Sequence, residues 1–381
     1  MRFIASTKRL AQALKAVGPA VGTRSTLPVL TGVRIEANKA GVTFEATDLE
    51  ASARYIMNDD VTIERAGQVV TPAKQLAKAV ASMGTDEITV ESIEAEGQGR
   101  VALHAGTRTV TLDAYPVEDF PTMPTESAIE PFASVSAAAL ADAFGRAAMC
   151  ASDDEARPVL MSVALFMTKG SPSSQIVATD SYRLGVIDVE LDEPSKETRT
   201  LLVPARVVKE LAKQMRKLRH AARIGLLDRG EDMQPSIAFS FGTSFWTARL
   251  IDGEFPNWQQ IVPEETGAAV EFEVDEMSSA LKSVAAVGNG NETPVRLSLG
   301  ETTTLALIEG DTAKIRETLA TAMFSPDGVG EIDAAFNAKY LADALRFVGG
   351  ERARMWVRDG LKPALIGEAD RRYVLMPVRL S

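Results

Sequence analysis

We expect an α+β fold in which one kind of domain occurs three times along the chain, because two strand–helix units each recur three times. The first unit opens the copies at residues 2–17, 132–148 and 272–287. The second recurs at residues 69–83, 201–215 and 334–348. Between them, apolar and polar residues alternate as in β-strands. Openings about 130 residues apart are too far for a solenoid. Each copy is therefore predicted to pack two helices on antiparallel sheets.

Two breaks in composition divide the chain into the three copies. A Pro-, Thr- and Glu-rich link surrounds Ser127 and Ala128, and a second break lies near Thr266 and Gly267. A length of 381 residues allows two or three domains. We therefore expect domains at 1–128, 129–265 and 266–381.

The helices have recognisable start signals. Apolar residues recur at helical spacing, as in Leu10, Leu14 and Val17. The predicted N-caps of the opening helices are Ser6, Ser136 and Asp275. Pro72 and Pro204 are expected in the first turn of the second helices, where proline loses no hydrogen bond.

A further element links the first two copies. Residues 26–37 (TLPVLTGVRIEA) resemble 156–167 (ARPVLMSVALFM), and 44–55 (FEATDLEASARY) resemble 176–187 (IVATDSYRLGVI). The repeated Ala-Thr-Asp makes Asp48 and Asp180 turn residues whose carboxylates accept from nearby backbone amides. Catalysis by these two aspartates is the weaker reading, because repetition assigns them to different domains.

Composition excludes several classes of protein. Apolar residues form 45% of the chain, and no run of eighteen apolar residues could cross a membrane. We read no export signal, so the expected location is the cytoplasm. One cysteine and two histidines provide neither a disulfide nor an ordinary structural zinc site, and phosphate-binding glycine loops are absent. We expect Cys150 to be a buried thiol, and we expect no metal, no cofactor and no enzymatic activity.

Basic residues gather on the helices although the net charge is −11. Residues 203–220 carry six basic residues and one acidic residue, Glu210. Few acids share the polar helix faces; they are Asp142, Glu210, Glu276 and Asp343. These faces are either simply solvated or present charge to a phosphate backbone. A ring of six helices leaves a hole of roughly 7 Å, whereas twelve leave roughly 24 Å. Only the larger hole admits a duplex about 20 Å wide, so enclosure of DNA requires two chains joined head to tail.

Several stretches resemble the β subunit of bacterial DNA polymerase III, the sliding clamp family. They are TLPVLTGVRIEA, ATDLE, ATDSYRLG, DGEFPNWQQIVP and YVLMPVRL, in order over essentially the whole chain. The resemblance implies a DNA-clamp fold and a homodimeric ring of six domains, which is a processivity factor in DNA replication. It implies as partners double-stranded DNA, an ATP-driven clamp loader, the DNA polymerase III alpha subunit, and repair and translesion polymerases that bind through short peptide motifs.

The resemblance also implies a peptide-binding pocket between the second and third domains. Its members would be Leu160, Thr179, Tyr182, Arg183, Leu184, Pro256, Ile261, Val374, Met376, Pro377, Val378 and Arg379. A mostly apolar cleft of this kind suits an extended peptide with Leu or Phe anchors. Tyr182 stands where the family more often has histidine, and Ser181 where it often has glycine.

The DNA-binding residues are predicted from the basic helices and from the resemblance. They are Arg24, Lys74, Lys78, Arg146, Arg206, Lys209 and Lys213. The dimer interface implied by the resemblance pairs Val110 and Leu112 with Ala286 and Val287 of a second copy. The family's aromatic pair near the second-domain loop falls on Pro158 and Val159.

Two alternatives remain at this point. The first is a scaffold or duplicate clamp of the same fold that binds proteins and does not load on DNA. The second is an enzyme that acts on nucleic acid through Asp48 and Asp180.

Overall fold

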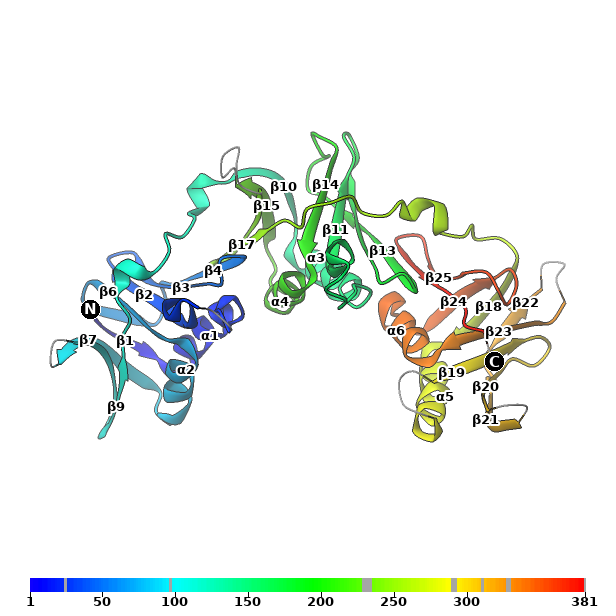
Figure 1. Cartoon of the computed structure of the whole chain (residues 1–381), viewed down its shortest axis with the longest axis horizontal. Coiled ribbons are helices and arrows are strands. Elements are labelled where there is room, and N and C mark those ends of the chain that lie inside the picture. Colours follow the sequence, from blue (N-terminus) through cyan, green and yellow to red (C-terminus); the bar gives the residue numbers. More distant parts are fainter. Residues whose placement is uncertain are drawn as a thin grey trace. The chain divides into compact units, whose positions relative to one another are not determined.

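The computed structural model describes residues 1–23, 26–95, 98–227, 235–288, 293–309, 312–326 and 330–379. These residues form six α-helices and 26 β-strands, labelled in Figure 1. The chain divides into two compact units. Unit 1 comprises Met1–Ala138 and Lys213–Leu250, and unit 2 comprises Ala139–Ala212 and Ile251–Ser381. The second repeat contributes to both units, and the domain boundaries expected from the sequence stay a prediction.

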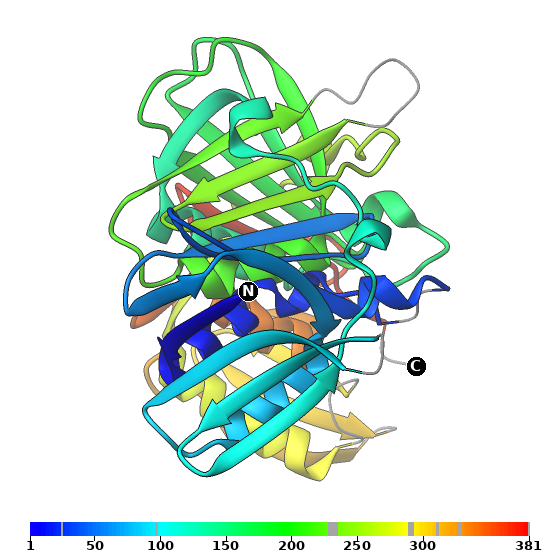
Figure 2. The same cartoon turned by 90° about the vertical axis from the view of Figure 1, so that its left-hand side faces the viewer.

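Unit 1 contains two antiparallel sheets. Its strands are β1 (Arg2–Ser6), β2 (Gly32–Asn38), β3 (Gly41–Thr47), β4 (Ala51–Met57), β5 (Val61–Arg65), β6 (Gly67–Pro72), β7 (Glu87–Ala95), β8 (Gln98–Ala105), β9 (Arg108–Asp113), β10 (Glu130–Ser136), β15 (Ala221–Leu227), β16 (Ser236–Phe241) and β17 (Ser244–Arg249). The strand orders are β5-β1-β7-β8-β9 and β10-β15-β16-β17-β4-β3-β2-β6. Figure 2 shows these strands from the side of the N-terminus.

The helices of unit 1 cover the sheets and close its core. They are α1 (Thr7–Val17) and α2 (Ala73–Ser82), which pack against each other. Helix α1 also contacts β3 and β4. Phe3 and Phe44 are fully buried there; buried and half-buried residues alternate along β1, whereas β3 is buried on both faces.

Unit 2 also contains two antiparallel sheets. Its strands are β11 (Ser162–Met167), β12 (Ser173–Thr179), β13 (Arg183–Glu190), β14 (Arg199–Pro204), β18 (Ala268–Glu273), β19 (Pro294–Leu299), β20 (Thr304–Glu309), β21 (Thr312–Thr318), β22 (Met323–Ser325), β23 (Ile332–Asn337), β24 (Arg352–Val357), β25 (Ala364–Glu368) and β26 (Arg371–Leu375). The strand orders are β14-β11-β12-β13-β26-β25-β24-β18-β22 and β21-β20-β19-β23.

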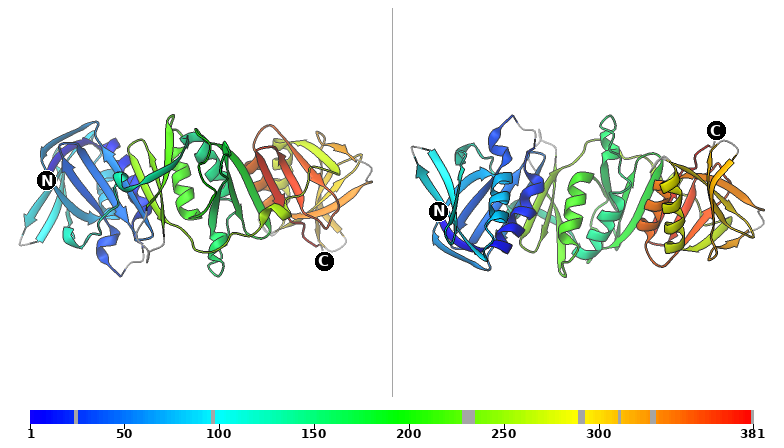
Figure 3. Two further views of the ribbon diagram at one scale, coloured as in Figure 1. Left: turned by 90° about the horizontal axis from the view of Figure 1, so that it is seen from above. Right: turned by 90° about the horizontal axis from the view of Figure 1, so that it is seen from below.

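Four helices belong wholly or partly to unit 2. They are α3 (Ala137–Ala147) and α4 (Ala205–Met215), whose ends reach into unit 1, and α5 (Val274–Val287) and α6 (Ala338–Val348). Figure 3 shows α5 and α6 side by side. Helix α6 packs on β25 and β26, and β26 pairs with β13. A strand of the third repeat thereby continues a sheet of the second repeat, and this junction holds the candidate site.

The observed helix starts test the predicted capping residues. The Ser6 hydroxyl accepts from the backbone N–H of Arg9 at 3.2 Å, which confirms this N-cap. The prediction for Asp275 is wrong, because α5 begins at Val274 and Asp275 lies inside its first turn. A carboxylate is favourable there too, since it faces the positive end of the helix dipole. Pro72 and Pro204 immediately precede α2 and α4 rather than lying within the first turn.

Candidate functional site

The turn between β12 and β13 forms one side of the candidate site. The Thr179 hydroxyl donates to the Arg183 carbonyl at 2.7 Å. Asp180 Oδ1 accepts the backbone N–H groups of Tyr182 and Arg183 at 2.9 and 3.0 Å. The turn role predicted for Asp180 is therefore confirmed. Ser181 has a φ of 80°, in the left-handed region that glycine adopts most easily.

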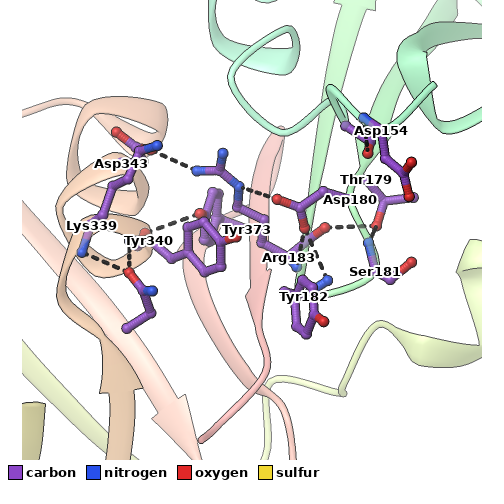
Figure 4. A network of polar contacts seen from close by, with 12 residues as sticks. Asp154, Thr179, Asp180, Ser181, Tyr182, Arg183, Lys339, Tyr340, Asp343 and Tyr373 are labelled. Carbon is purple, nitrogen blue, oxygen red and sulfur yellow. Dashed lines mark hydrogen bonds and ion pairs between the residues drawn. The ribbon is translucent and has the colours of Figure 1, made fainter. Parts of the chain in front are cut away.

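The guanidinium of Arg183 lies in a buried network, shown in Figure 4. Its Nε donates to Asp180 Oδ2 at 2.9 Å, and its Nη1 donates to Asp343 Oδ2 at 2.6 Å. Arg183 is 7% exposed and Asp343 is 6% exposed. Buried charges are tolerated only when they are paired and hydrogen-bonded. The charge of Arg183 is therefore directed at two carboxylates of its own chain.

Three tyrosines lie against this network. The ring of Tyr340, on α6, faces the Arg183 guanidinium, whose carbon is 4.4 Å from the ring centroid. The ring of Tyr182 stacks on Tyr340 with centroids 6.4 Å apart and an interplanar angle of 26°. Tyr373 donates from its hydroxyl to the Tyr340 carbonyl at 3.0 Å. Tyr182 is 59% exposed, so the stack presents one aromatic face at the surface.

The end of β26 completes this side of the site. Leu184 pairs with Val374 across β13 and β26, and both side chains are buried. One residue beyond β26, the Met376 N–H donates to the Tyr182 carbonyl at 2.9 Å. The Met376 side chain is 41% exposed. The Val378 N–H donates to the Ala335 carbonyl in β23 at 2.8 Å, which fixes the C-terminal segment.

Buried aromatic residues connect the remaining pocket residues to this junction. Leu184 and Val374 belong to a cluster with Trp258, against which Phe255 also packs. Trp258 opens the 3₁₀ turn Trp258–Ile261, where Ile261 is exposed, and Pro256 is exposed beside Phe255. Leu160 is buried in the 3₁₀ turn Pro158–Met161, which contacts β11. Pro377 is half-buried and Arg379 is exposed.

This arrangement suits an apolar ligand segment. Tyr182, Ile261 and Met376 are large exposed apolar side chains, and each lies within three residues along the chain of a member of the buried cluster, Leu184, Trp258 or Val374. An extended peptide with apolar anchors fits such chemistry, and methionine adapts to ligands of different shape. The assignment of these residues to a peptide site stays a prediction.

Two residues that touch this site were not predicted as part of it. Tyr340 stacks on Tyr182, and Asp343 binds Arg183. The expectation that Asp343 lies on a polar helix face is wrong, because its side chain is buried. The repeat gives no signal for Asp343, because the matching positions of residues 69–83 and 201–215 hold Lys78 and Glu210.

The predicted DNA-binding residues differ in their environment. Arg24 lies outside the described residues. Exposed side chains on α2 and α4 belong to Lys74, Lys78, Arg206, Lys209 and Lys213. Lys209 has a carboxylate partner, Asp153, at 4.0 Å.

Arg146 is engaged within unit 2. Its guanidinium donates to the carbonyl of Phe347 at 2.7 Å and to that of Arg346, both at the end of α6. It also donates to Asp142 at 2.8 Å. Carbonyls at a helix C-terminus attract cations, so this guanidinium caps α6. A role for Arg146 toward DNA stays a prediction.

The predicted dimer residues lie on two different kinds of surface. Val110 and Leu112 are half-buried on β9, the outermost strand of its sheet. Ala286 and Val287 are exposed at the end of α5. An outermost strand presents unpaired backbone groups that another chain can bind.

Cys150 is fully buried, and burial raises the pKa of its thiol, so it remains protonated and unreactive. No group of three or more described His, Cys, Asp or Glu side chains is arranged to hold a metal. Within the described part of the chain, no helix combines the length and apolar character needed to span a membrane.

The three domains of one family match the chain in order. Residues 1–124 match the N-terminal domain, 134–257 the central domain and 259–379 the C-terminal domain of the DNA polymerase III beta subunit. The beta sliding clamp of Pseudomonas aeruginosa is 26% identical over 385 residues, with both chains covered completely.

Solved structures agree with this match. A DNA polymerase sliding clamp from Bacillus subtilis superposes with a TM-score of 0.87 at 22% identity over the whole of both chains, which supports the fold. A sliding clamp from Bartonella birtlesii, bound to griselimycin, has a TM-score of 0.85 at 26% identity, again over both whole chains. The chain thus belongs to the DNA polymerase III beta subunit family, the beta sliding clamps.

Proposed function

We propose that two copies of this chain close head to tail around duplex DNA and hold the replicative polymerase on it. The single observation that carries the proposal is the ordered match of all three beta-subunit domains. A closed ring retains DNA by topology, so weak contacts suffice and sliding is preserved. In this proposal the chain has no catalytic activity of its own and acts in the cytoplasm, on the chromosome.

Charge distribution supports a duplex as the enclosed ligand. The net charge is −11, yet α2 exposes Lys74 and Lys78, and α4 exposes Arg206, Lys209 and Lys213. Flexible basic side chains on a helix face bind phosphates and do not read bases. Such binding is independent of sequence and weakens as salt rises. A protein that must move along DNA needs this kind of contact.

An outermost strand and a small apolar surface support self-association. Strand β9 carries Val110 and Leu112, and the last turn of α5 carries Ala286 and Val287. The two surfaces differ, so contact between them is heterologous, and two such contacts close a head-to-tail pair. We expect a solution mass twice the 40.8 kDa of one chain.

The surface around Tyr182, Ile261 and Met376 supports the proposed partners. These exposed side chains are apolar, and the segments that carry them contribute to one buried hydrophobic cluster, which suits short peptides with Leu or Phe anchors. Such peptides would come from the polymerase III alpha subunit, the clamp loader, and repair and translesion polymerases. Substitution of Met376 and Pro377 by alanine should weaken peptide binding and leave the dimer mass unchanged.

Charge reversal tests the DNA side of the proposal. The variant Lys74→Glu, Lys78→Glu should reduce loading on nicked circular DNA by a cognate loader, with a weaker dependence on salt. Lys39→Glu is the matched control, because Lys39 is exposed in the turn after β2. Equal loading of both variants and wild type would show that Lys74 and Lys78 do not contact the duplex, and absence of loading by all three would favour a protein-binding scaffold that does not encircle DNA.

A further inference from the structure

We propose that Asp343 and Arg183 are positioning residues of the peptide-binding site, and that they act by holding the Tyr182–Tyr340 stack in place. The inference rests on the proposed peptide-binding function and adds to it the residues that preorganise the surface. The ligand is of the same class, a short peptide with apolar anchors.

Arg183 is buried and bound to two carboxylates of its own chain, so it does not serve as a ligand contact. Its side chain is 7% exposed, and its Nε and Nη1 donate to Asp180 and Asp343. The planar guanidinium is a rigid fork whose donors point in fixed directions. Because the two carboxylates come from the β12–β13 turn and from α6, the fork fixes the distance between these two elements.

The carboxylate of Asp343 is itself held in one orientation. Its Oδ2 accepts from Arg183 at 2.6 Å, and its Oδ1 accepts from Arg346 at 3.1 Å. Arg346 is on the same helix, three residues away, so this second bond sets the carboxylate against α6 itself. With both oxygens engaged, Asp343 transmits the position of α6 to Arg183.

Tyr340 connects the Arg183–Asp343 ion pair to the exposed ring of Tyr182. Tyr340 precedes Asp343 by one helical turn, and its ring lies 4.4 Å from the Arg183 guanidinium carbon. Tyr182 stacks on Tyr340, while Asp180 binds the Tyr182 backbone N–H at 2.9 Å. The exposed ring of Tyr182 is thus placed by a chain of contacts that begins at Asp343. Figure 4 shows the side chains of this chain of contacts.

An exposed aromatic ring that is already ordered costs less to immobilise when a ligand binds. Loss of the Asp343 carboxylate leaves the Arg183 fork with one carboxylate and frees α6 to shift. We expect peptide affinity to fall about tenfold, which is within the range of coupling between residues in one network.

The test compares three single variants for binding of a fluorescein-labelled short peptide with Leu and Phe anchors. Asp343→Asn keeps the shape and removes the charge, and Arg183→Lys keeps the charge and removes the fork. Asp142→Asn is the matched control, since Asp142 also pairs with arginines in unit 2, Arg146 at 2.8 Å and Arg371 at 3.3 Å. The first two variants should bind about tenfold more weakly and the control as wild type.

A double variant separates positioning from general stability. In a Tyr182→Ala background, Asp343→Asn should have no further effect on affinity, because its effect passes through the Tyr182 ring. The ¹⁹F resonance of fluorotyrosine at position 182 should also shift in Asp343→Asn. The inference would be overturned if the affinity losses of Tyr182→Ala and Asp343→Asn add up in the double variant. Wild-type affinity in both Asp343→Asn and Arg183→Lys would overturn it too. Failure of the wild type to bind the peptide would instead overturn the proposed function. If Asp343→Asn does not fold, Arg183→Lys decides alone.

Discussion

The same turn occurs at residues 47–51 of unit 1 and at residues 179–183 of unit 2. In the first, the Thr47 hydroxyl donates to the Ala51 carbonyl at 3.0 Å, and Asp48 Oδ1 accepts from two backbone N–H groups. Thr179 and Asp180 make the equivalent bonds in the second. Leu49 and Ser181 both have left-handed φ values, 75° and 80°. A Thr-Asp pair therefore determines the turn in both places.

The turns differ in their last three residues, which are Leu49, Glu50 and Ala51 in one and Ser181, Tyr182 and Arg183 in the other. Ala51 and Arg183 each open a strand that joins two repeats, since Ala51 pairs with Ala248 and Arg183 pairs with Leu375. Only Arg183 extends to a carboxylate of the neighbouring repeat, Asp343. The backbone geometry was thus kept in both copies, and the side chains of Tyr182 and Arg183 distinguish the candidate site from its structural equivalent.

The largest expected effect comes from removing the aspartate of each turn. Asp180→Ala loses the turn bonds and leaves Arg183 buried with one carboxylate fewer, so it should lower the stability of unit 2 by about 3 kcal/mol. Asp48→Ala loses the equivalent turn bonds and should lower the stability of unit 1 by about 1 kcal/mol. Hydrogen exchange of amides in β13 and β4 measures the two effects. Equal losses would contradict the distinction between the turns.

A smaller effect is expected at Gly185, whose equivalent in the first copy is the fully buried Ala53. A Cβ at Gly185 would lie 2.4 Å from Phe347 Cε2 and 2.9 Å from Cys150 Sγ. Gly185→Ala should therefore destabilise unit 2 by about 1–3 kcal/mol, as overpacked cores do. Thermal unfolding monitored by circular dichroism measures the change.

Gly145 provides the control for this substitution. It lies in α3, and a Cβ there meets only Ala212 Cβ, at an ordinary 3.8 Å. Gly145→Ala should stabilise the protein by about 0.5–1 kcal/mol, because alanine is the better helix former. Stabilisation by both substitutions would show that α6 does not approach β13 as closely as described.

The smallest effect on stability is expected at Leu49 and Ser181, the two turn residues with left-handed φ values. Leu49→Gly should raise stability by about 0.5 kcal/mol, since relief of the strained φ slightly exceeds the entropy cost of glycine. Ser181→Gly should gain less, because the Ser181 hydroxyl also accepts from Arg157 at 3.0 Å. Melting temperatures of the two variants give the comparison, and a larger gain for Ser181→Gly would contradict it.

The features that were predictable from sequence are the local ones. Helical spacing and the repeat predicted α1 to α6, and the Ala-Thr-Asp motif predicted the turn bonds of Asp48 and Asp180. These depend on residues a few positions apart, so their determinants lie together in the sequence.

The candidate site was less predictable because it depends on distant partners. Asp343 reads as a solvated helix residue until β26 pairs with β13 and brings α6 to Arg183. Arg146 is predicted as a DNA contact, and its bond to the carbonyl of Phe347 at the end of α6 is a further role that the sequence did not indicate. Nothing in the local spacing of either residue indicates the partner.

Retention on DNA of different topology tests whether two copies of the chain form a ring around duplex DNA. The protein is loaded onto nicked circular DNA by a cognate loader, and its dissociation is followed before and after a restriction enzyme linearises the circle. A closed ring should dissociate slowly from the circle, even at high salt, and should leave the linear product rapidly. Dissociation at the same rate from both forms would contradict enclosure.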